Sequence, residues 1–302
     1  MSNEPFHWFV VRSLFLTLFS LAGSLQLPAQ ELTIYTIPSP KGYDWVSPRK
    51  LAFSYISNFF AAPGKSRVKH LIGHMMVELK DSTRHVIVGV SPARHSRMIR
   101  KVLVEGKGLG ILFEKTEGVL NETEFNSKEI NPRISSGEIA FLQFRISQPA
   151  FDRLWQYYIE YKENGYYHSY NGLNNPLERT GAGCSAFAFS FLEVAGLQDM
   201  IPPEICRIER PVPFTLMRNE ASHWRQVSVV ELLLVNKWPA RNDSNSQLYS
   251  TFEPTWLFQW IQQNHSYLPA SGKLQQTWLM NAPGVLFDCR DKPVPAGSFW
   301  KN

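Results

Sequence analysis

The spacing of apolar residues predicts mainly β-strands in the first half of the chain. Residues 31–37 alternate between polar and apolar side chains, as a strand with one buried face does. Two further apolar runs flank the turn-forming cluster Asp81-Ser82-Thr83, which predicts a β-hairpin. Two more runs around Gly106-Lys107-Gly108 predict a second hairpin. The predicted strands cover residues 31–37, 68–80, 85–90, 99–104, 109–114 and 138–146.

A helical repeat appears after these strands. One apolar face recurs at helical spacing, and Pro149 suits the first turn of that helix. The residues of this face are Phe151, Leu154, Trp155, Tyr158 and Ile159. A second helix is predicted over residues 184–195; Glu193 is its only charge, so it should be buried, and Gly196 suits its end. A third is predicted over residues 254–264. Together the elements predict an α+β fold.

The first 29 residues have the pattern of a secretory signal. Arg12 precedes an uncharged apolar run of about 15 residues, and Ala29 offers a small residue for cleavage. The alternative is a membrane anchor, but a spanning helix needs about 20 apolar residues. We therefore expect an exported protein, periplasmic or extracellular, with residues 1–29 removed.

The character of the chain changes after residue 198. Four prolines interrupt residues 199–213, and six of the nine tryptophans lie between residues 199 and 302. Trp256, Trp260 and Trp278 are large apolar side chains that need burial. We therefore predict a core over residues 30–198 and a C-terminal extension over residues 199–302 that packs on it.

Composition narrows the possible functions. Of 302 residues, 44% are hydrophobic, which excludes a disordered chain, and 31 basic against 26 acidic residues give too small an excess to indicate nucleic-acid binding. The cysteine spacing lacks a zinc pattern, and no metal or cofactor is predicted. One basic segment contains no acid; it forms either a solvated face or a contact with an anionic membrane surface or envelope polymer. Its residues include Arg94, Arg97, Arg100 and Lys101.

Cys184 is the strongest candidate for chemistry. The glycine-rich turn Thr180–Gly183 leads into the predicted buried helix at Cys184. The free N–H groups and positive end of a helix stabilise a thiolate and can hold an oxyanion. The alternatives are a packed core thiol or half of a disulfide bond. In an exported chain with three cysteines, Cys206 and Cys289 are expected to pair, which would leave Cys184 free.

His74 is the candidate base because it follows Gly73 on a predicted strand. A histidine in this setting is either a satisfied core residue or a base that faces a cleft. If the hairpin turn has two or four residues, His85 lies on the same face as His74 and could orient its ring. Glu78 is the alternative orienting residue. Tyr170 and Asn171, shortly before Cys184, line the cleft or belong to a surface loop.

These pieces resemble the circularly permuted branch of the NlpC-type papain-like hydrolases, in which the histidine strand precedes the cysteine helix, as in the lecithin:retinol acyltransferase-like proteins. The resemblance covers residues 66–198 and rests on three segments. They are Ile72-Gly73-His74-Met75-Met76-Val77-Glu78, His85, and Gly181-Ala182-Gly183-Cys184-Ser185-Ala186-Phe187 with Glu193-Val194-Ala195-Gly196-Leu197.

The resemblance implies a permuted papain-like core in which an antiparallel sheet packs on the cysteine helix. It implies Cys184 as nucleophile, His74 as general base and then acid, and His85 as orienting residue. Gly183 and Ser185 would contact substrate beside the thiol. The expected function is an exported thiol hydrolase that cleaves amide bonds, with cell-wall peptides as the leading substrate. A lipid or thioester acyl hydrolase or transferase, and a non-catalytic envelope-binding module, remain as alternatives.

Overall fold

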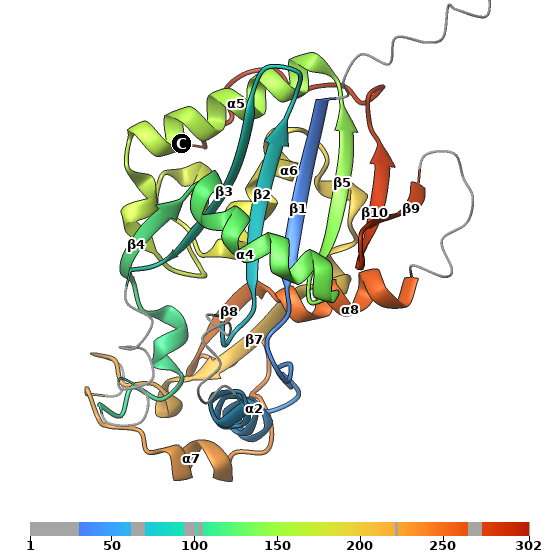
Figure 1. The fold of residues 1–302 in the computed structure, drawn as a ribbon. Coiled ribbons are helices and arrows are strands. Elements are labelled where there is room, and N and C mark those ends of the chain that lie inside the picture. Colours follow the sequence, from blue (N-terminus) through green and yellow to red (C-terminus); the bar gives the residue numbers. More distant parts are fainter. Residues whose placement is uncertain are drawn as a thin grey trace, which may run out of the picture.

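An eight-stranded mixed sheet forms the centre of the protein (Figure 1). The structure is a computed structural model and describes residues 30–61, 70–93, 101, 105–220, 223–264 and 274–301. The sheet has the strand order β6-β4-β3-β2-β1-β5-β10-β9, and all its neighbours are antiparallel except β5 and β10. The chain is therefore α+β, as its sequence predicts.

The elements are bounded as follows. The sheet strands are β1 (Gln30–Ile37), β2 (His74–Lys80), β3 (His85–Pro92), β4 (Thr116–Asn121), β5 (Ala140–Ile146), β6 (Ser169–Tyr170), β9 (Leu274–Leu279) and β10 (Ala282–Asp288). Strands β7 (Arg207–Pro213) and β8 (Ser246–Phe252) form a separate antiparallel pair. The α-helices of the described residues are α2 (Pro48–Ala61), α4 (Thr123–Ser136), α5 (Gln148–Glu163), α6 (Cys184–Val194), α7 (Val229–Leu234) and α8 (Pro254–Asn264).

The two faces of the sheet pack against different helices. Met75, Val77 and Leu79 of β2 belong to the core that the sheet shares with α5, α6 and α8. Met76, the neighbour that points the other way, belongs to the core that includes Ile130 and Ile134 of α4. Figure 1 shows α4 in front of β1 and β2 and α6 behind them. Any side chain of β2 is therefore directed either to α4 or to the cysteine helix α6.

The predicted hairpin of β2 and β3 is confirmed, with Lys80 opposite His85. The Asp81 carboxylate accepts hydrogen bonds from the N–H groups of Thr83 at 2.8 Å and Arg84 at 2.6 Å, which fixes a four-residue turn. Strand β2 begins only at His74, however, so His74 is the first residue of the strand and not a residue in its middle.

The second predicted hairpin is wrong over its described part. Leu109–Phe113 forms the 3₁₀ helix η1 instead of a strand. Gly108 precedes it with a φ of 55°, and a Cβ there would lie 2.5 Å from the carbonyl oxygen of Leu216. The close approach of another segment, which no local pattern records, decides this turn. Residues 99, 100 and 102–104 lie outside the described residues.

The C-terminal part is joined to the core more closely than the sequence predicts. Strand β10 pairs in parallel with β5, and α8 packs against the same sheet. The expected boundary at residue 198 therefore separates no independent unit. Trp256 and Trp260 are partly buried, but Trp278 is 58% exposed, because it lies on the edge strand β9. Its predicted burial is wrong.

A second lobe lies below the sheet in Figure 1. It consists of α2, α7, η1 and the β7–β8 pair, which pack around a core of their own that includes Leu51, Val212 and Leu232. Cys206, just before β7, is buried, and so is Cys289, just after β10. They do not form the expected disulfide bond.

The predicted signal segment, residues 1–29, lies outside the described residues. Within the described part of the chain, the helices are too short or too polar to cross a membrane.

Candidate functional site

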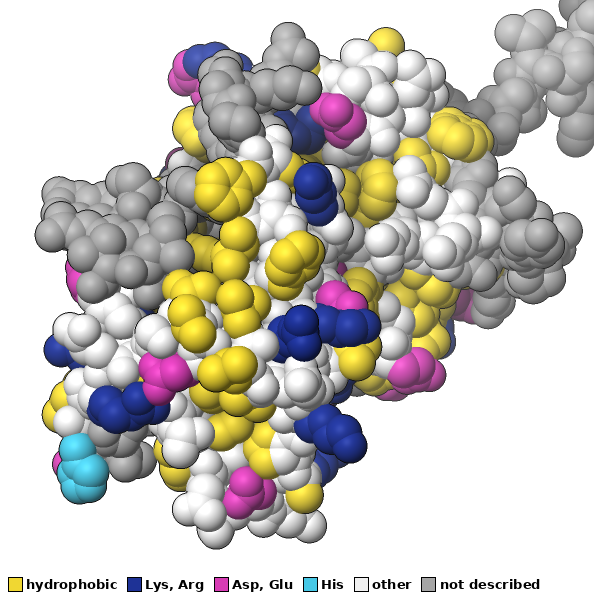
Figure 2. Space-filling view, turned by 90° about the horizontal axis from the view of Figure 1, so that it is seen from below, with side chains coloured by type: hydrophobic (Ala, Val, Ile, Leu, Met, Phe, Trp, Pro, Cys, Tyr) yellow, Lys and Arg dark blue, Asp and Glu magenta, His cyan; other side chains and the backbone are white. Residues whose placement is uncertain are grey.

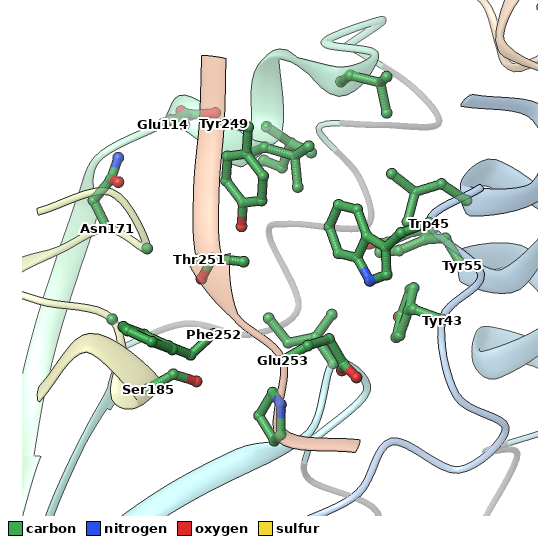
Figure 3. Close-up of a pocket in the computed structure, with 18 of the residues that line it drawn as sticks. Tyr43, Trp45, Tyr55, Glu114, Asn171, Ser185, Tyr249, Thr251, Phe252 and Glu253 are labelled. Carbon is green, nitrogen blue, oxygen red and sulfur yellow. The ribbon is translucent and has the colours of Figure 1, made fainter. Parts of the chain in front are cut away.

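A cavity of about 170 Å³ lies between the start of α6 and the second lobe. Figure 3 shows side chains that line it, with Ser185 and Asn171 on one side and the aromatic residues Trp45, Tyr43 and Tyr55 on the other. Most of the remaining wall is aliphatic or aromatic. These residues include Leu51, Ala52, Ile56, Leu109, Leu112, Val229, Leu232 and Phe252. A cavity with such a wall suits an apolar ligand.

The glycine-rich turn places Cys184 on this wall. Gly181 has a φ of +89°, and a Cβ there would lie 2.0 Å from the carbonyl oxygen of Ser169. Only glycine fits this position. The N–H of Ala182 then bonds the same oxygen at 3.1 Å, and α6 begins at Cys184 after an extended Gly183. Cys184 lines the cavity and is 6% exposed, so it is reached through the cavity.

Two hydroxyl side chains lie beside Cys184 on the cavity wall. The Ser185 hydroxyl is 3.9 Å from the Cys184 sulfur, and Tyr170 lines the same part of the cavity. Burial raises the Tyr170 pKa well above its ordinary value, and the neighbouring Cys184 raises it further. The Tyr170 hydroxyl therefore stays protonated near neutral pH.

Asn171 lies on the cavity wall, but its amide is used within the fold. It donates to the carbonyl of Phe113 at 2.8 Å and accepts from the N–H of Leu173 at 2.6 Å. Asn171 therefore holds η1 beside the strand that carries Tyr170. Gly183, Ser185, Tyr170 and Asn171 thus lie with Cys184 at one cavity, as expected from the sequence.

His74 is not brought to this cavity. It pairs with Ile37 in the sheet, and both side chains lie on the face covered by α4. On the next strand, a Cβ at Gly89 would lie 3.5 Å from the Nε2 atom of His74, so this glycine leaves room for the ring on the same face. The cysteine helix packs on the opposite face. The predicted Cys184–His74 pair is therefore not formed.

The surroundings of His74 are those of a core histidine. Its ring stacks on His70 with 4.0 Å between the ring centres, and the His70 Nε2 atom lies 3.0 Å from the Glu129 carboxylate of α4. Burial lowers the pKa of His74 to about 4, with Glu129 opposing the shift and Arg133 adding to it. The ring is neutral at pH 7 and joins α4 to the sheet.

His85 does not orient His74. The four-residue turn places both rings on one face of the hairpin, as the parity argument requires, but six residues of strand separate Lys80, opposite His85, from His74. At about 3.3 Å per residue the two positions are about 20 Å apart. His85 instead bonds Glu78 at 2.7 Å, and Glu78 accepts from the Tyr35 hydroxyl at 2.6 Å. Glu78, the alternative orienting residue, therefore bonds His85 and Tyr35 and does not orient His74.

The cavity also contains polar residues that were not predicted. Tyr43 and Trp45 come from the loop before α2, Tyr55 from α2, and Tyr249 and Thr251 from β8. These positions have no shared spacing in the sequence, because the cavity forms only when separate segments meet.

Glu253, between β8 and α8, is the buried acid of the cavity. It is 3% exposed, and its carboxylate accepts from the N–H of Trp256 at 3.0 Å. Burial raises its pKa to about 7, against the effect of hydrogen bonds from Thr255 and Trp256. One sequence signal could have found it: an acid directly before Pro254 caps a helix that begins with proline.

The helices that wall the cavity carry apolar side chains on their outer sides as well. Helix α2 exposes Phe53 and Phe60, and α7 exposes Val230 and Leu234. Figure 2 views the molecule from below, the end where these helices lie in Figure 1, and shows hydrophobic side chains gathered among Lys and Arg side chains. Both helices therefore present apolar side chains to solvent as well as to the cavity.

Most of the predicted basic segment lies outside the described residues, including Arg94, Arg97 and Arg100. Lys101 is described, and its Nζ atom lies 2.6 Å from the Glu114 carboxylate. Its charge is therefore compensated within the protein.

Comparisons with protein-family models, curated proteins and solved structures found no match to this chain. Within the described residues, no group of histidine, cysteine, aspartate and glutamate side chains is placed to hold a metal ion.

Proposed function

We propose that this protein is an exported thiol-dependent acyl hydrolase or transferase whose substrate carries an apolar acyl chain. One observation carries the proposal: Cys184, at the first turn of a buried helix, lies on the wall of an apolar cavity. The chain would lie against the aliphatic and aromatic wall, and its carbonyl carbon would meet the Cys184 sulfur. Lipid esters and thioesters are the substrates that such a wall favours over peptides.

The proposed chemistry is acyl transfer through sulfur. The Cys184 sulfur bonds to the carbonyl carbon, the bond from that carbon to the leaving alcohol or thiol breaks, and the thiol proton passes to the leaving group. Water or a second alcohol or thiol then takes the acyl group and restores the Cys184 thiol. Tyr170, which is protonated near neutral pH and lies beside Cys184 on the cavity wall, would donate to the carbonyl oxygen in the first step.

Amide hydrolysis, the leading expectation from the sequence, has less support. Amides are poor acyl donors and need a base and acid beside the thiol. His74 lies on the other face of the sheet, and no histidine lines the cavity within the described residues. We keep a distant relation to the permuted papain-like fold as a proposal: the β2–β3 hairpin precedes the cysteine helix, and antiparallel strands pack on it.

An ester substrate tests the proposal. The protein is incubated with p-nitrophenyl octanoate and p-nitrophenyl acetate, release of nitrophenol is followed, and intact mass reports acylation. We expect an octanoyl adduct on Cys184 that neutral hydroxylamine removes, and faster reaction with octanoate. Cys184→Ala should abolish the adduct and the nitrophenol release that depends on it.

Cys206→Ala is the matched control, because Cys206 is buried outside the cavity and its pKa is raised to about 12 by burial and by Glu253. It should react as the wild type does. Equal acylation of wild type and Cys184→Ala would rule out Cys184 as the acyl acceptor.

A second candidate is ligand binding without catalysis. The absence of a histidine beside Cys184 among the described residues of the cavity wall favours this alternative. It predicts that octanoyl esters bind equally well to wild type and Cys184→Ala and that neither protein is acylated.

A further inference from the structure

Helices α2 and α7 place apolar side chains on the outer surface of the second lobe. Phe53 and Phe60 are seven residues apart, close to two helical turns, so both lie on one side of α2. Val230 and Leu234 are four residues apart and share one side of α7. Phe53 is 64% and Leu234 is 72% exposed. These four side chains are called the outer apolar face below.

The two helices that carry this face lie against each other. The N–H of Arg49, in the first turn of α2, donates to the carbonyl oxygen of Val235 at 2.9 Å, directly after α7. The Arg49 side chain donates to the Asn236 side chain at 3.4 Å. Figure 2 shows hydrophobic side chains gathered at this end of the molecule. Apolar side chains that gather on an exposed surface mark an interaction site.

The charges beside the outer apolar face are positive in excess. The carboxylate just before α2 and the one within α7 are neutralised by ion pairs, Asp44–Lys50 and Glu231–Arg225. Arg49 precedes Phe53 by about one turn and so lies on the same side of α2. Arg49 and Lys237 are both exposed, and neither pairs with a carboxylate of the described residues. Their charges complement anionic lipid headgroups.

The inner sides of the same helices wall the cavity. Ala52 lines the cavity while the adjacent Phe53 is exposed, and Val229 lines it while the adjacent Val230 is exposed. A single layer of helices therefore separates the cavity from the outer apolar face. A bilayer against this face would hold its lipids about one helix diameter, ~10 Å, from the apolar cavity.

We propose that the outer apolar face docks on an anionic membrane surface. Its four apolar side chains would enter the acyl-chain region, and Arg49 and Lys237 would lie at the phosphate groups. The proposal rests on the proposed function, because a substrate with an apolar acyl chain favours a membrane over a protein as the partner. It also identifies the source of that substrate as membrane lipid. A second copy of the chain fits less well, since it would bring the uncompensated cations of two molecules together.

Co-sedimentation of the full chain with lipid vesicles tests the face. One set of vesicles is phosphatidylcholine and the other is phosphatidylcholine mixed with anionic phosphatidylglycerol. The wild type should bind the anionic vesicles more tightly, and high salt should reduce this preference. Phe53→Ser should weaken binding to both sets about 10-fold, because it removes buried apolar area. Arg49→Gln combined with Lys237→Gln should weaken binding about 20-fold on anionic vesicles only.

Helix α4 provides the matched controls. Phe125 is an exposed phenylalanine of α4, and Lys128 is an exposed lysine of the same helix. Phe125→Ser and Lys128→Gln should bind vesicles as the wild type does. Residues 1–29 are identical in all variants, so differences between variants report the substituted positions. Circular dichroism verifies that each variant is folded.

The outcomes separate this proposal from the proposed function. Equal vesicle affinity of the wild type and Phe53→Ser, or no binding of the wild type, would overturn the docking face. A dimer in analytical ultracentrifugation that Phe53→Ser dissociates, without vesicle binding, would assign the face to a second copy and also overturn it. The variants of the outer face do not line the cavity and should acylate Cys184 with p-nitrophenyl octanoate at the wild-type rate. Absence of the octanoyl adduct in the wild type would overturn the proposed function instead.

Discussion

The buried His74 should make the stability of this protein fall in mild acid. Burial lowers its pKa from 6.5 to about 4 in the folded state, whereas the unfolded chain titrates at the ordinary value. Between pH 6.5 and about 4, His74 therefore binds a proton in the unfolded state but stays unprotonated in the folded state. The contribution of a neutral His74 is complete above pH 6.5 and is lost as pH falls toward 4.

The magnitude follows from the shift. Each pH unit in this window corresponds to about 1.36 kcal/mol, so His74 should cost about 2 kcal/mol of unfolding free energy between pH 7 and pH 5. His70 titrates in the same window, with its pKa also lowered to about 4 by burial and by His74. The effect of His74 is therefore measured as the difference between the wild type and His74→Leu, whose aliphatic side chain partly fills the space of the ring and cannot bind a proton.

Urea unfolding at pH 7 and pH 5, followed by tryptophan fluorescence, measures this difference. The wild type should lose about 2 kcal/mol more than His74→Leu between the two pH values. Iodoacetamide should label Cys184 at the same rate in both proteins, because the ring and the thiol lie on opposite faces of the sheet. The placement of His74 would be refuted if the variant lost as much stability in acid as the wild type, or if its Cys184 reacted much more slowly.

Two further predictions concern single positions of the fold, both measured by urea unfolding. Gly181→Ala places a Cβ 2.0 Å from the Ser169 carbonyl oxygen and should destabilise by about 2–4 kcal/mol. Gly297→Ala has a similar φ of +81° but open space around it, and should cost only about 1 kcal/mol. Trp278→Ala should lower the free energy of unfolding by less than about 1 kcal/mol, because the side chain is 58% exposed. Phe287→Ala should lower it by about 3–5 kcal/mol, because Phe287 is 2% exposed. Similar losses in the two variants would contradict the edge position of β9.

Local sequence determined the elements whose pattern is complete within a short segment. Strand β1, the hairpin turn at Asp81, and helices α5, α6 and α8 follow from periodicity, turn residues and caps that lie within a few positions of each other. The placement of Cys184 at a helix start is of this kind, since Gly181 and Gly183 immediately precede it. Helix α4 contains Pro132, a residue that local rules place outside helix interiors, so tertiary contacts are needed to account for it.

Tertiary structure decided which residues meet. Alternation along β2 directs His74 and Met75 to opposite faces of the sheet. Only the packing of α4 and α6 on these faces decides that His74 stacks on His70, the partner of Glu129, and that Met75 meets the cysteine helix. Tertiary structure also decides that β10 pairs with β5, about 140 residues away in the chain. It likewise brings Tyr43, Tyr170 and Glu253 to one cavity. Such contacts join segments distant in the chain, and their free energy depends on buried area and shape, which no local spacing of residue types encodes.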